Sequence, residues 1–465
     1  MSDAATRHRA RAVLAPTSTT PAVVPVEIRA LSALKLHPRT LRRHPEQQVA
    51  QLADGIRQFG FLCPLVVDEQ GFILAGHARH AAALQAGLSE VPVVLAGHLS
   101  AAQKRAFRLA DNKLAELADW DAEVLKLELT DLSVLDLDFS VELTGFSTAE
   151  IDVILDGTSD DSAEESEELP PPRPRAVSQP GDLWRLGKHV LYCGDAREPA
   201  SYARLLGDRR AHLIVTDAPY NVRVDGHVSG RGRIKHREFA MASGEMSKAE
   251  FTEFLTTVFR HLAVHSVDGA LQYLFMDHRH VEEMLAAGAQ AYDERLNILV
   301  WKKTNAGLGS MYRSQHELIF VYKHGQAPHV NNVRLGANGR YRTNVLEYPG
   351  ANTFRSGRDE ELTRHPTPKT VGLIADLIRD ASRTGDLVLD CFAGGGTIFI
   401  AAEKTRRHAA AIEIDPLYCD LSIERWQLHT SEKAVLSETG ESFDAMALSR
   451  GTSEPAPLAA EAGHG

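Results

Sequence analysis

The chain has 465 residues. This length is too great for one ordinary domain and predicts about two or three domains. Its hydrophobic content of 43% and charged content of 24% are typical of a soluble globular protein, and no apolar run reaches the roughly 18 residues that a membrane span needs. The four cysteines are scattered and form no CxxC pair, which argues against a structural zinc site. Since the N-terminus also lacks a secretory signal, we expect a cytoplasmic protein with no membrane partner and no metal.

The net charge of −11 comes from two segments. Residues 156–168 hold seven acids and no base, and residues 431–465 hold six acids and two bases. Because the rest of the chain is formally neutral, the charge does not exclude a nucleic-acid partner. Both segments have compositions typical of disorder. We therefore expect an acidic, proline-rich linker at 156–180 and a disordered tail at 431–465, with folded blocks between these segments.

The first block, residues 24–120, alternates short strands and helices. Apolar residues at helical spacing predict a helix over 46–59 that ends at Gly60. The stretch PLVVDEQGFILAG predicts two strands joined by a turn, and the alanine-rich HARHAAALQAGL predicts a helix before a further strand. Residues 121–155 are expected to form a helical extension of this block.

This block resembles the ParB/sulfiredoxin-like N-terminal domain in the FGFLCPLVVD strand, the AGHARHAAA turn and the ADNKLAE stretch. ParB proteins grip nucleotide phosphates with a Gly-Glu-Arg-Arg turn, of which Gly76 and Arg79 are present here. A glycine turn before a helix N-terminus can bind an anion, with Arg79 supplying charge. The alternative is that Gly76 only makes the turn, and that His77 and His80 lie on a solvated helix face.

Two segments carry the chemistry of the second block, residues 181–430. In IVTDAPYN (214–221), an apolar strand stops at an acid. In LVLDCFAGGGTIFIAAEKTRRHAAAIEID (387–415), a strand, a glycine-rich turn and a helix lead to a second strand that ends in acids. Glycines let a ligand approach the backbone at the carboxyl end of a strand. Glu413 follows Gly394 at a spacing close to the ~20 residues of nucleoside-binding units.

Together these segments resemble the β group of the DNA amino-methyltransferases, which act on adenine N6 or cytosine N4. The order of the two turns, the segment LYCGDAREP (191–199) and the segment HPTPKT (365–370) follow that group, with departures at Pro368 and Thr370. The resemblance implies an α/β fold, namely a Rossmann-like S-adenosylmethionine-dependent methyltransferase domain preceded by a smaller α+β ParB/sulfiredoxin-like domain. It assigns catalytic roles to Asp217, Ala218, Pro219 and Tyr220. It assigns binding of the cofactor S-adenosyl-L-methionine to Asp195, Asp390, Phe392, Ala393, Gly394, Gly396, Thr397, Glu413, Pro366, Thr367 and Lys369.

The expected chemistry explains why a strand would end in this way. An exocyclic amino nitrogen is a poor nucleophile because its lone pair is conjugated with the ring. Asp217 can accept one amino hydrogen and the carbonyl of Ala218 the other, while Tyr220 offers a face on which a flipped base can stack. The family usually has proline where this chain has Ala218, but alanine keeps the carbonyl. An acid at 217 favours adenine N6 over cytosine N4.

Double-stranded DNA is the expected partner, and a homodimer is left open. The glycine-rich loop 221–239 is expected to contact phosphates through its basic residues. These are Arg223, Arg231, Arg233, Lys235 and Arg237. The segment 326–364 resembles the family's target-recognition region by position. The alternatives are a cytosine-N4 methyltransferase, a ParB-like DNA-binding protein with a degenerate methyltransferase block, and methylation of RNA or of protein glutamine.

Overall fold

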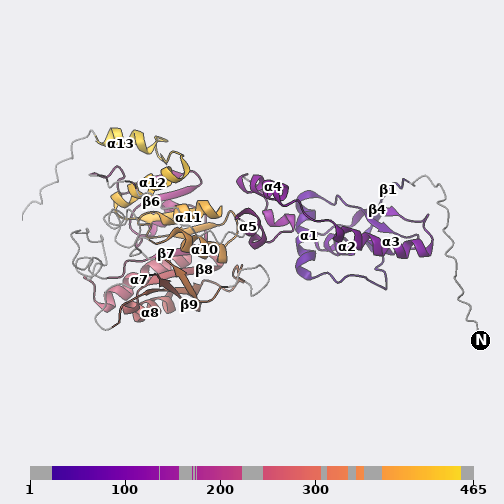
Figure 1. The fold of residues 1–465 in the computed structure, drawn as a ribbon, viewed down its shortest axis with the longest axis horizontal. Coiled ribbons are helices and arrows are strands. Elements are labelled where there is room, and N and C mark those ends of the chain that lie inside the picture. Colours follow the sequence, from indigo (N-terminus) through magenta and orange to yellow (C-terminus); the bar gives the residue numbers. More distant parts are fainter. Residues whose placement is uncertain are drawn as a thin grey trace, which may run out of the picture. The chain divides into compact units, whose positions relative to one another are not determined.

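The computed structural model describes residues 23–135, 137–156, 170, 173, 175–221, 245–304, 312–333, 342–349 and 369–451. The chain forms two compact units (Figure 1). The first comprises Met1–Asp121 and Leu137–Gly145, and the second comprises Ala122–Asp136 and Phe146–Gly465. Among the described residues, no helix has the length and apolar character needed to cross a membrane.

The first unit contains a four-stranded sheet in the order β1-β4-β2-β3, packed with helices (Figure 1). Its buried core includes Leu65, Val67, Ile73 and Val93, which the strands point to one side. The helix expected over 46–59 is present with those bounds. The strands are β1 (Val26–Ala30), β2 (Leu65–Val67), β3 (Ile73–Ala75) and β4 (Glu90–Leu95), and the helices are α1 (Glu46–Phe59), α2 (His77–Gln85) and α3 (Ala101–Leu114), with short 3-10 turns at Leu31–Ala33, Ala115–Leu117 and Val141–Thr144.

A ten-stranded mixed sheet forms the centre of the second unit, in the order β11-β9-β10-β8-β7-β12-β13-β6-β5-β14. The strands β8, β7, β12, β13 and β6 run parallel, so their carboxyl ends share one edge. This is the edge where α/β folds bind ligands. The strands are β5 (Leu183–Leu186), β6 (His189–Cys193), β7 (Ala211–Asp217), β8 (Ser266–Met276), β9 (Glu294–Lys303), β10 (His316–Lys323), β11 (Val345–Tyr348), β12 (Leu387–Asp390), β13 (His408–Glu413) and β14 (Val435–Leu436).

Helices cover both faces of this sheet (Figure 1), because its central strands are apolar on both sides. Along β7, Leu213 and Val215 enter one core cluster and Ile214 enters the other. The first cluster packs against α10, α11, α12 and α13, and the second against α6, α7 and α8. The helices are α6 (Pro199–Leu206), α7 (Lys248–Val264), α8 (Val281–Ala291), α10 (Val371–Ala381), α11 (Thr397–Thr405), α12 (Pro416–Thr430) and α13 (Phe443–Gly451), with a 3-10 turn at His278–His280.

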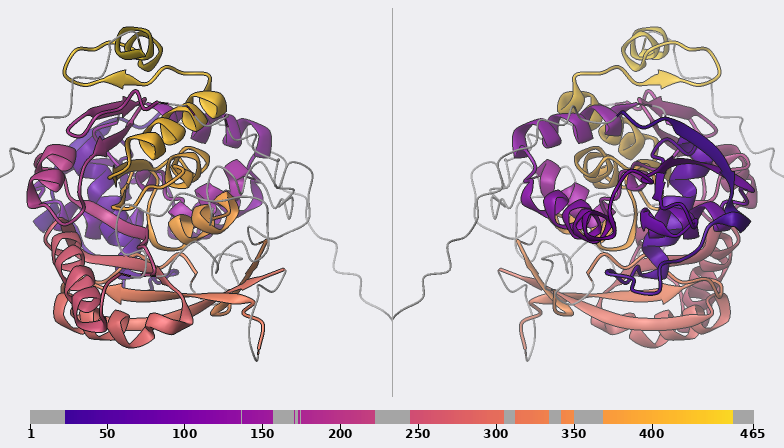
Figure 2. Two further views of the ribbon diagram at one scale, coloured as in Figure 1. Left: turned by 90° about the vertical axis from the view of Figure 1, so that its left-hand side faces the viewer. Right: turned by 90° about the vertical axis from the view of Figure 1, so that its right-hand side faces the viewer.

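The chain beyond residue 431 is ordered as far as Gly451, so the prediction of a disordered tail from 431 is wrong over this stretch. Strand β14 pairs with β5 and extends the sheet, and α13 follows it beside α12 (Figure 2). The ring of Phe443 is fully buried and lies edge-on to Trp184, with 5.3 Å between ring centroids. The acidic composition concealed these few apolar side chains, which are sufficient to anchor the segment.

The carboxyl end of the expected linker is also packed. The backbone N–H groups of Val177 and Ser178 donate to the buried carboxylate of Asp420, at 2.6 and 2.9 Å. The guanidinium of Arg450 donates to the carbonyl of Val177 and pairs with Asp182. Residues 177–182 are therefore part of the second unit, so the predicted linker extends too far at its carboxyl end.

The helices α4 (Ala122–Val134) and α5 (Thr148–Asp156) contact each other and belong to the second unit. Asp152 of α5 and Arg407, just before β13, form an ion pair in which both side chains are fully buried. Its two contacts measure 2.9 and 3.2 Å. This pair attaches the helical extension to the ten-stranded sheet.

Candidate active site

The turn after β7 is held by its last residue and by the helix that follows. Asp217 ends the strand, and Ala218 behind it is buried. Asn221 has a positive φ of 49°, and its side chain exchanges two hydrogen bonds with the backbone of Met246, at 2.8 and 3.2 Å. Met246 directly precedes Ser247, the N-cap residue of α7, which forms a capping box with Glu250. The turn therefore has a fixed position at the ligand-binding edge of the sheet.

Asp217 belongs to a cluster of ionisable groups from four parts of the fold. The Nζ atom of Lys369, just before α10, lies 2.8 Å from Asp217 Oδ2 and 2.8 Å from Glu317 Oε2 on β10. The Tyr220 hydroxyl lies 2.7 Å from Asp217 Oδ1 and 2.9 Å from Glu317 Oε2, so its single hydrogen can be donated to either carboxylate. Lys303, at the end of β9, pairs with the other oxygen of Glu317.

The cluster shifts the pKa values of its two carboxyl groups in opposite directions. Burial raises the pKa of Asp217, and the charge of Glu317 adds to this while Lys369 opposes it. Burial would also raise the pKa of Glu317, but Lys369 and Lys303 lower it to about 2. Burial lowers the pKa of Lys369, but the two carboxylates outweigh it, so the net shift is upward. The two lysines therefore favour the ionised form of Glu317, and the charge of Asp217 depends on its neighbours.

The end of β12 lies directly beside this cluster, because β7 and β12 are parallel neighbours. The Thr216 hydroxyl donates to Oδ1 of Asp390 at 2.7 Å, and the backbone N–H of Phe392 donates to the same oxygen at 3.0 Å. Burial is the main cause that raises the pKa of Asp390 to about 7. This contact connects the strand that carries Asp217 to the strand that opens the glycine turn.

The glycine turn closes against the end of β13. The backbone N–H of Gly394 donates to Glu413 Oε2 at 2.7 Å, and that of Asp415 donates to Oε1 at 2.9 Å. Gly394 and Gly396 have φ values of 51° and 73°, and a Cβ on Gly396 would lie 2.8 Å from the side chain of Ser422. Burial raises the pKa of Glu413 to about 7. Each Glu413 oxygen keeps acceptor capacity, which fits a pair of ribose hydroxyls.

The other predicted cofactor residues that the structure describes surround the same turn. The N–H of Ala393 donates to the carbonyl of Ile412 at 3.0 Å, and the side chain of Phe392 packs against Phe254 of α7. The hydroxyl of Thr397, the first residue of α11, lies 3.4 Å from the carbonyl oxygen of Lys369. Lys369 thus contacts the helix that follows the glycine turn through its backbone, and the Asp217 cluster through its side chain.

Asp195 reaches this edge from β6, whose last residue, Cys193, is in register with Glu413. Its carboxylate pairs with Arg197 at 2.6 Å. Pro366 and Thr367 lie outside the described residues, as do the five basic residues of the 221–239 loop and most of the segment 326–364. Their predicted roles therefore stay predictions.

The sequence interpretation did not identify Glu317 or Lys303, and it assigned Lys369 only to the cofactor. The sequence does show an acid, Glu317, at the start of the apolar strand HELIFVY. That this acid lies beside Asp217 follows only from the pairing of β10 with β8 and β9, which brings Glu317 to the edge that carries Asp217.

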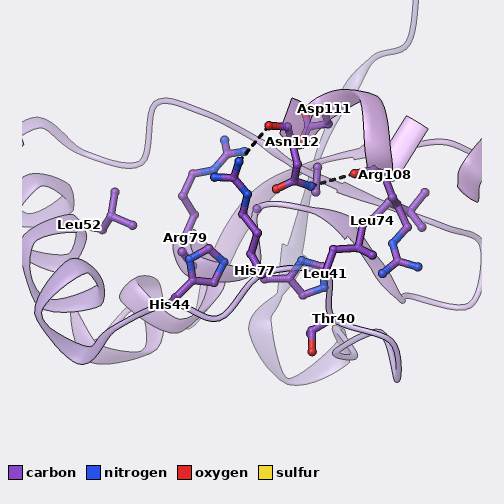
Figure 3. A pocket seen from close by; sticks show the side chains of 14 residues that line it. Thr40, Leu41, His44, Leu52, Leu74, His77, Arg79, Arg108, Asp111 and Asn112 are labelled. Atoms are coloured by element: carbon purple, nitrogen blue, oxygen red, sulfur yellow. Dashed lines mark hydrogen bonds between the residues drawn. The ribbon is translucent and has the colours of Figure 1, made fainter. Parts of the chain in front are cut away.

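The first unit contains a pocket of about 250 Å³ beside the Gly76 turn (Figure 3). Arg79 does reach it, but its guanidinium donates to the carbonyls of Cys63 and Pro64, at 2.8 and 3.1 Å. His80 is buried, so the alternative interpretation, in which His77 and His80 lie on a solvated helix face, is wrong for His80. The lining residues are Thr40, Leu41, Arg42, His44, Leu52, Leu74, Ala75, Gly76, His77, Ala78, Arg79, Arg108, Asp111 and Asn112.

Three protein families match successive parts of the chain. The ParB N-terminal domain matches residues 14–113, the ParB-methyltransferase HTH domain matches 123–180, and the N6/N4 DNA methylase family matches 211–424. A ParB-like nuclease domain-containing protein, YnaK of Escherichia coli K12, is 40% identical over 77 residues, which are 17% of this chain and 88% of YnaK.

The second unit has its own relatives. The type II methyltransferase M2.MboI of Moraxella bovis is 30% identical over 138 residues, which are 28% of this chain and 49% of that enzyme. Among solved structures, the PvuII DNA methyltransferase, described as cytosine-N4-specific, is 13% identical. The alignment covers 56% of this chain and 90% of that one, with a TM-score of 0.39.

Proposed function

We propose that this chain, in which residues 211–424 match the N6/N4 DNA methylase family and residues 14–113 match the ParB N-terminal domain, transfers a methyl group from S-adenosyl-L-methionine to N6 of adenine in double-stranded DNA. One observation carries the proposal: an acid that can accept a hydrogen from an amino group lies at the strand end next to the glycine turn. The hydrogen bond of 2.7 Å between Thr216 and Asp390 joins the two strands at this point.

The glycine turn is suited to the cofactor. A side chain at Gly396 would occupy space beside Ser422, and the backbone around Gly394 turns with positive φ. We assign the ribose hydroxyls to Glu413, because its buried oxygens each have acceptor capacity left after one backbone hydrogen bond. The cofactor, when bound, supplies a methyl group on a positively charged sulfur.

Asp217 and the backbone carbonyl of Ala218 orient the amino group. As each accepts a hydrogen, the nitrogen lone pair is directed away from the ring and toward the methyl carbon. The nitrogen gains a bond to carbon and must lose one proton, and Asp217 is the nearest acceptor in this arrangement. The Tyr220 ring is partly buried against the core, and its hydroxyl is fixed by the two carboxylates. Its face is the surface on which we place the flipped base.

The acid at 217 supports adenine over cytosine. The direct test is incubation of the full chain with labelled S-adenosyl-L-methionine and unmethylated double-stranded DNA, followed by digestion to nucleosides. We expect label in N6-methyladenine and none in the Asp217→Ala variant. Label in N4-methylcytosine would support the alternative specificity. An absence of label from all bases over a broad set of DNA sequences would refute the proposed function.

A further inference from the structure

Lys369 occupies the space between the buried carboxylate of Glu317 and the partly buried carboxylate of Asp217. Its ammonium lies 2.8 Å from one oxygen of Asp217 and 2.8 Å from one oxygen of Glu317, and its side chain is 7% exposed. The rings of Tyr220, Phe275 and Trp301 surround it, with centroids 5.3, 5.3 and 5.5 Å from Nζ. Such rings are favourable neighbours for a cation and exclude water from it.

The charges in this cluster are not balanced without Lys369. Glu317 has a second cation, Lys303, on its other oxygen. Among the residues that the structure describes, no second cation pairs with Asp217, and its other partner is the neutral hydroxyl of Tyr220. Asp390, on the adjacent β12, adds a further acid that interacts with Asp217. Asp217 is therefore surrounded by acidic groups, and Lys369 is the cation that offsets them.

Building on the proposed function, we propose that Lys369 is a positioning residue that keeps Asp217 ionised, and that Glu317 holds the ammonium in place for this purpose. An ionised Asp217 can accept a hydrogen from the amino group of the base through either oxygen and can take the proton that the nitrogen loses. A protonated Asp217 would present an O–H donor to an amino group that is itself a donor, and it could not take that proton. The ion pair also leaves further lone pairs on Asp217 free for the substrate.

The same lysine connects the base site to the cofactor turn. Its backbone carbonyl oxygen lies 3.4 Å from the Thr397 hydroxyl at the start of α11, and Thr370, the next residue, caps α10. The ammonium is thus placed by a segment whose position depends on the glycine turn.

The test is a charge-deletion cycle in the full chain, read as the pH dependence of methyl transfer at saturating substrates. In Lys369→Met, Asp217 loses its cation and keeps the repulsion of Glu317. Its pKa therefore rises, so the acidic limb of the profile should move upward by about one pH unit or more. In the double variant Lys369→Met/Glu317→Gln, the repulsion is also removed, and the limb should move back toward its wild-type position. A limb that stays in place in Lys369→Met would overturn the proposal, even if the rate falls.

Glu283 provides the matched control, because it is a buried glutamate on α8 outside this cluster. Glu283→Gln should leave the acidic limb unchanged. Circular dichroism and thermal unfolding check that each variant is folded.

A second readout does not need activity and separates this inference from the proposed function. Infrared difference spectra of Lys369→Met against Lys369→Met/Asp217→Asn, at about pH 6, should show the C=O band of a protonated carboxyl group. The same comparison of wild type against Asp217→Asn should show an ionised carboxylate. All four proteins also carry Asp390→Asn, because the protonation of Asp390 depends on Asp217, and the Glu413 carboxyl is common to both members of each pair. An ionised Asp217 in Lys369→Met would refute the inference, whereas a wild type without methyl transfer would refute only the proposed function.

Discussion

The buried ion pair of Asp152 and Arg407 allows a quantitative prediction about how the catalytic unit is stabilised. All the N–H groups of the Arg407 guanidinium point at protein acceptors. Besides the Asp152 carboxylate, these are the carbonyls of Thr405 and Ser382, at 2.6 and 2.8 Å, and the Ser382 hydroxyl at 3.2 Å. Asp152→Ala would leave a buried cation with neutral partners only.

Removing one member of a buried pair costs about 3–5 kcal/mol, because the other charge stays buried without compensation. The carbonyls of Thr405 and Ser382 remain in Asp152→Ala, so we expect a loss near the lower end, about 3 kcal/mol. With a denaturant slope of about 3 kcal/mol per molar urea, the unfolding midpoint should fall by about 1 M. Glu128→Gln, at an exposed acid of α4, is the control and should change the midpoint little.

The assay is urea unfolding of the full chain, followed by the fluorescence of the buried tryptophans of the second unit. A midpoint shift below about 0.2 M in Asp152→Ala would show that the helical extension does not stabilise this unit. The same reasoning predicts that a chain of residues 176–465, which lacks Asp152, is less stable than one of residues 122–465.

Three further predictions concern the catalytic edge. Gly396→Ala should weaken S-adenosyl-L-methionine binding and lower stability by about 1 kcal/mol or more, because φ at this position is 73° and the new Cβ would lie 2.8 Å from the side chain of Ser422. Gly385→Ala is the control, since its φ is 82° and no atom lies near the new Cβ, so it measures the backbone cost alone. Equal results for the two variants in calorimetry and urea unfolding would contradict this prediction. Burial raises the pKa of Glu413 to about 7, so an ionised Glu413 that accepts ribose hydroxyls predicts affinity rising about tenfold from pH 6 to pH 8, and a flat profile in wild type would count against that role. Ala218→Pro should keep or raise the turnover number, because the carbonyl acceptor remains; a large loss of turnover in a folded variant would show that this turn differs from that of the family.

The fold of the catalytic unit could be predicted from sequence where local signals were strong. An apolar run that ends in Asp217 and a glycine turn between Asp390 and Glu413 are short-range patterns, and they located the ends of β7, β12 and β13. Parallel strands place such ends at one edge, so the neighbourhood of these residues followed from topology.

The contacts that sequence reasoning did not find are long-range or depend on few side chains. Glu317 and Lys369 are 52 residues apart, and Asp152 and Arg407 are 255 residues apart, so no local spacing connects them. In the acidic tail, the buried ring of Phe443 offsets a composition that predicts disorder. Charge counts describe a segment's average, whereas docking is decided by one or two apolar residues that fit an existing surface.

We place methyl transfer at the end of β7, with Asp217 as the acceptor of an amino hydrogen. Single-turnover methyl transfer from bound S-adenosyl-L-methionine to DNA, compared between wild type and Asp217→Ala, tests this assignment. Asp208→Ala is the control, since Asp208 is an exposed acid that precedes β7 at the opposite edge of the sheet. We predict a rate at least about 100-fold lower in Asp217→Ala, with cofactor affinity retained and the Asp208 variant unaffected. A rate in Asp217→Ala within a few-fold of wild type, in a protein that binds the cofactor normally, would contradict the account.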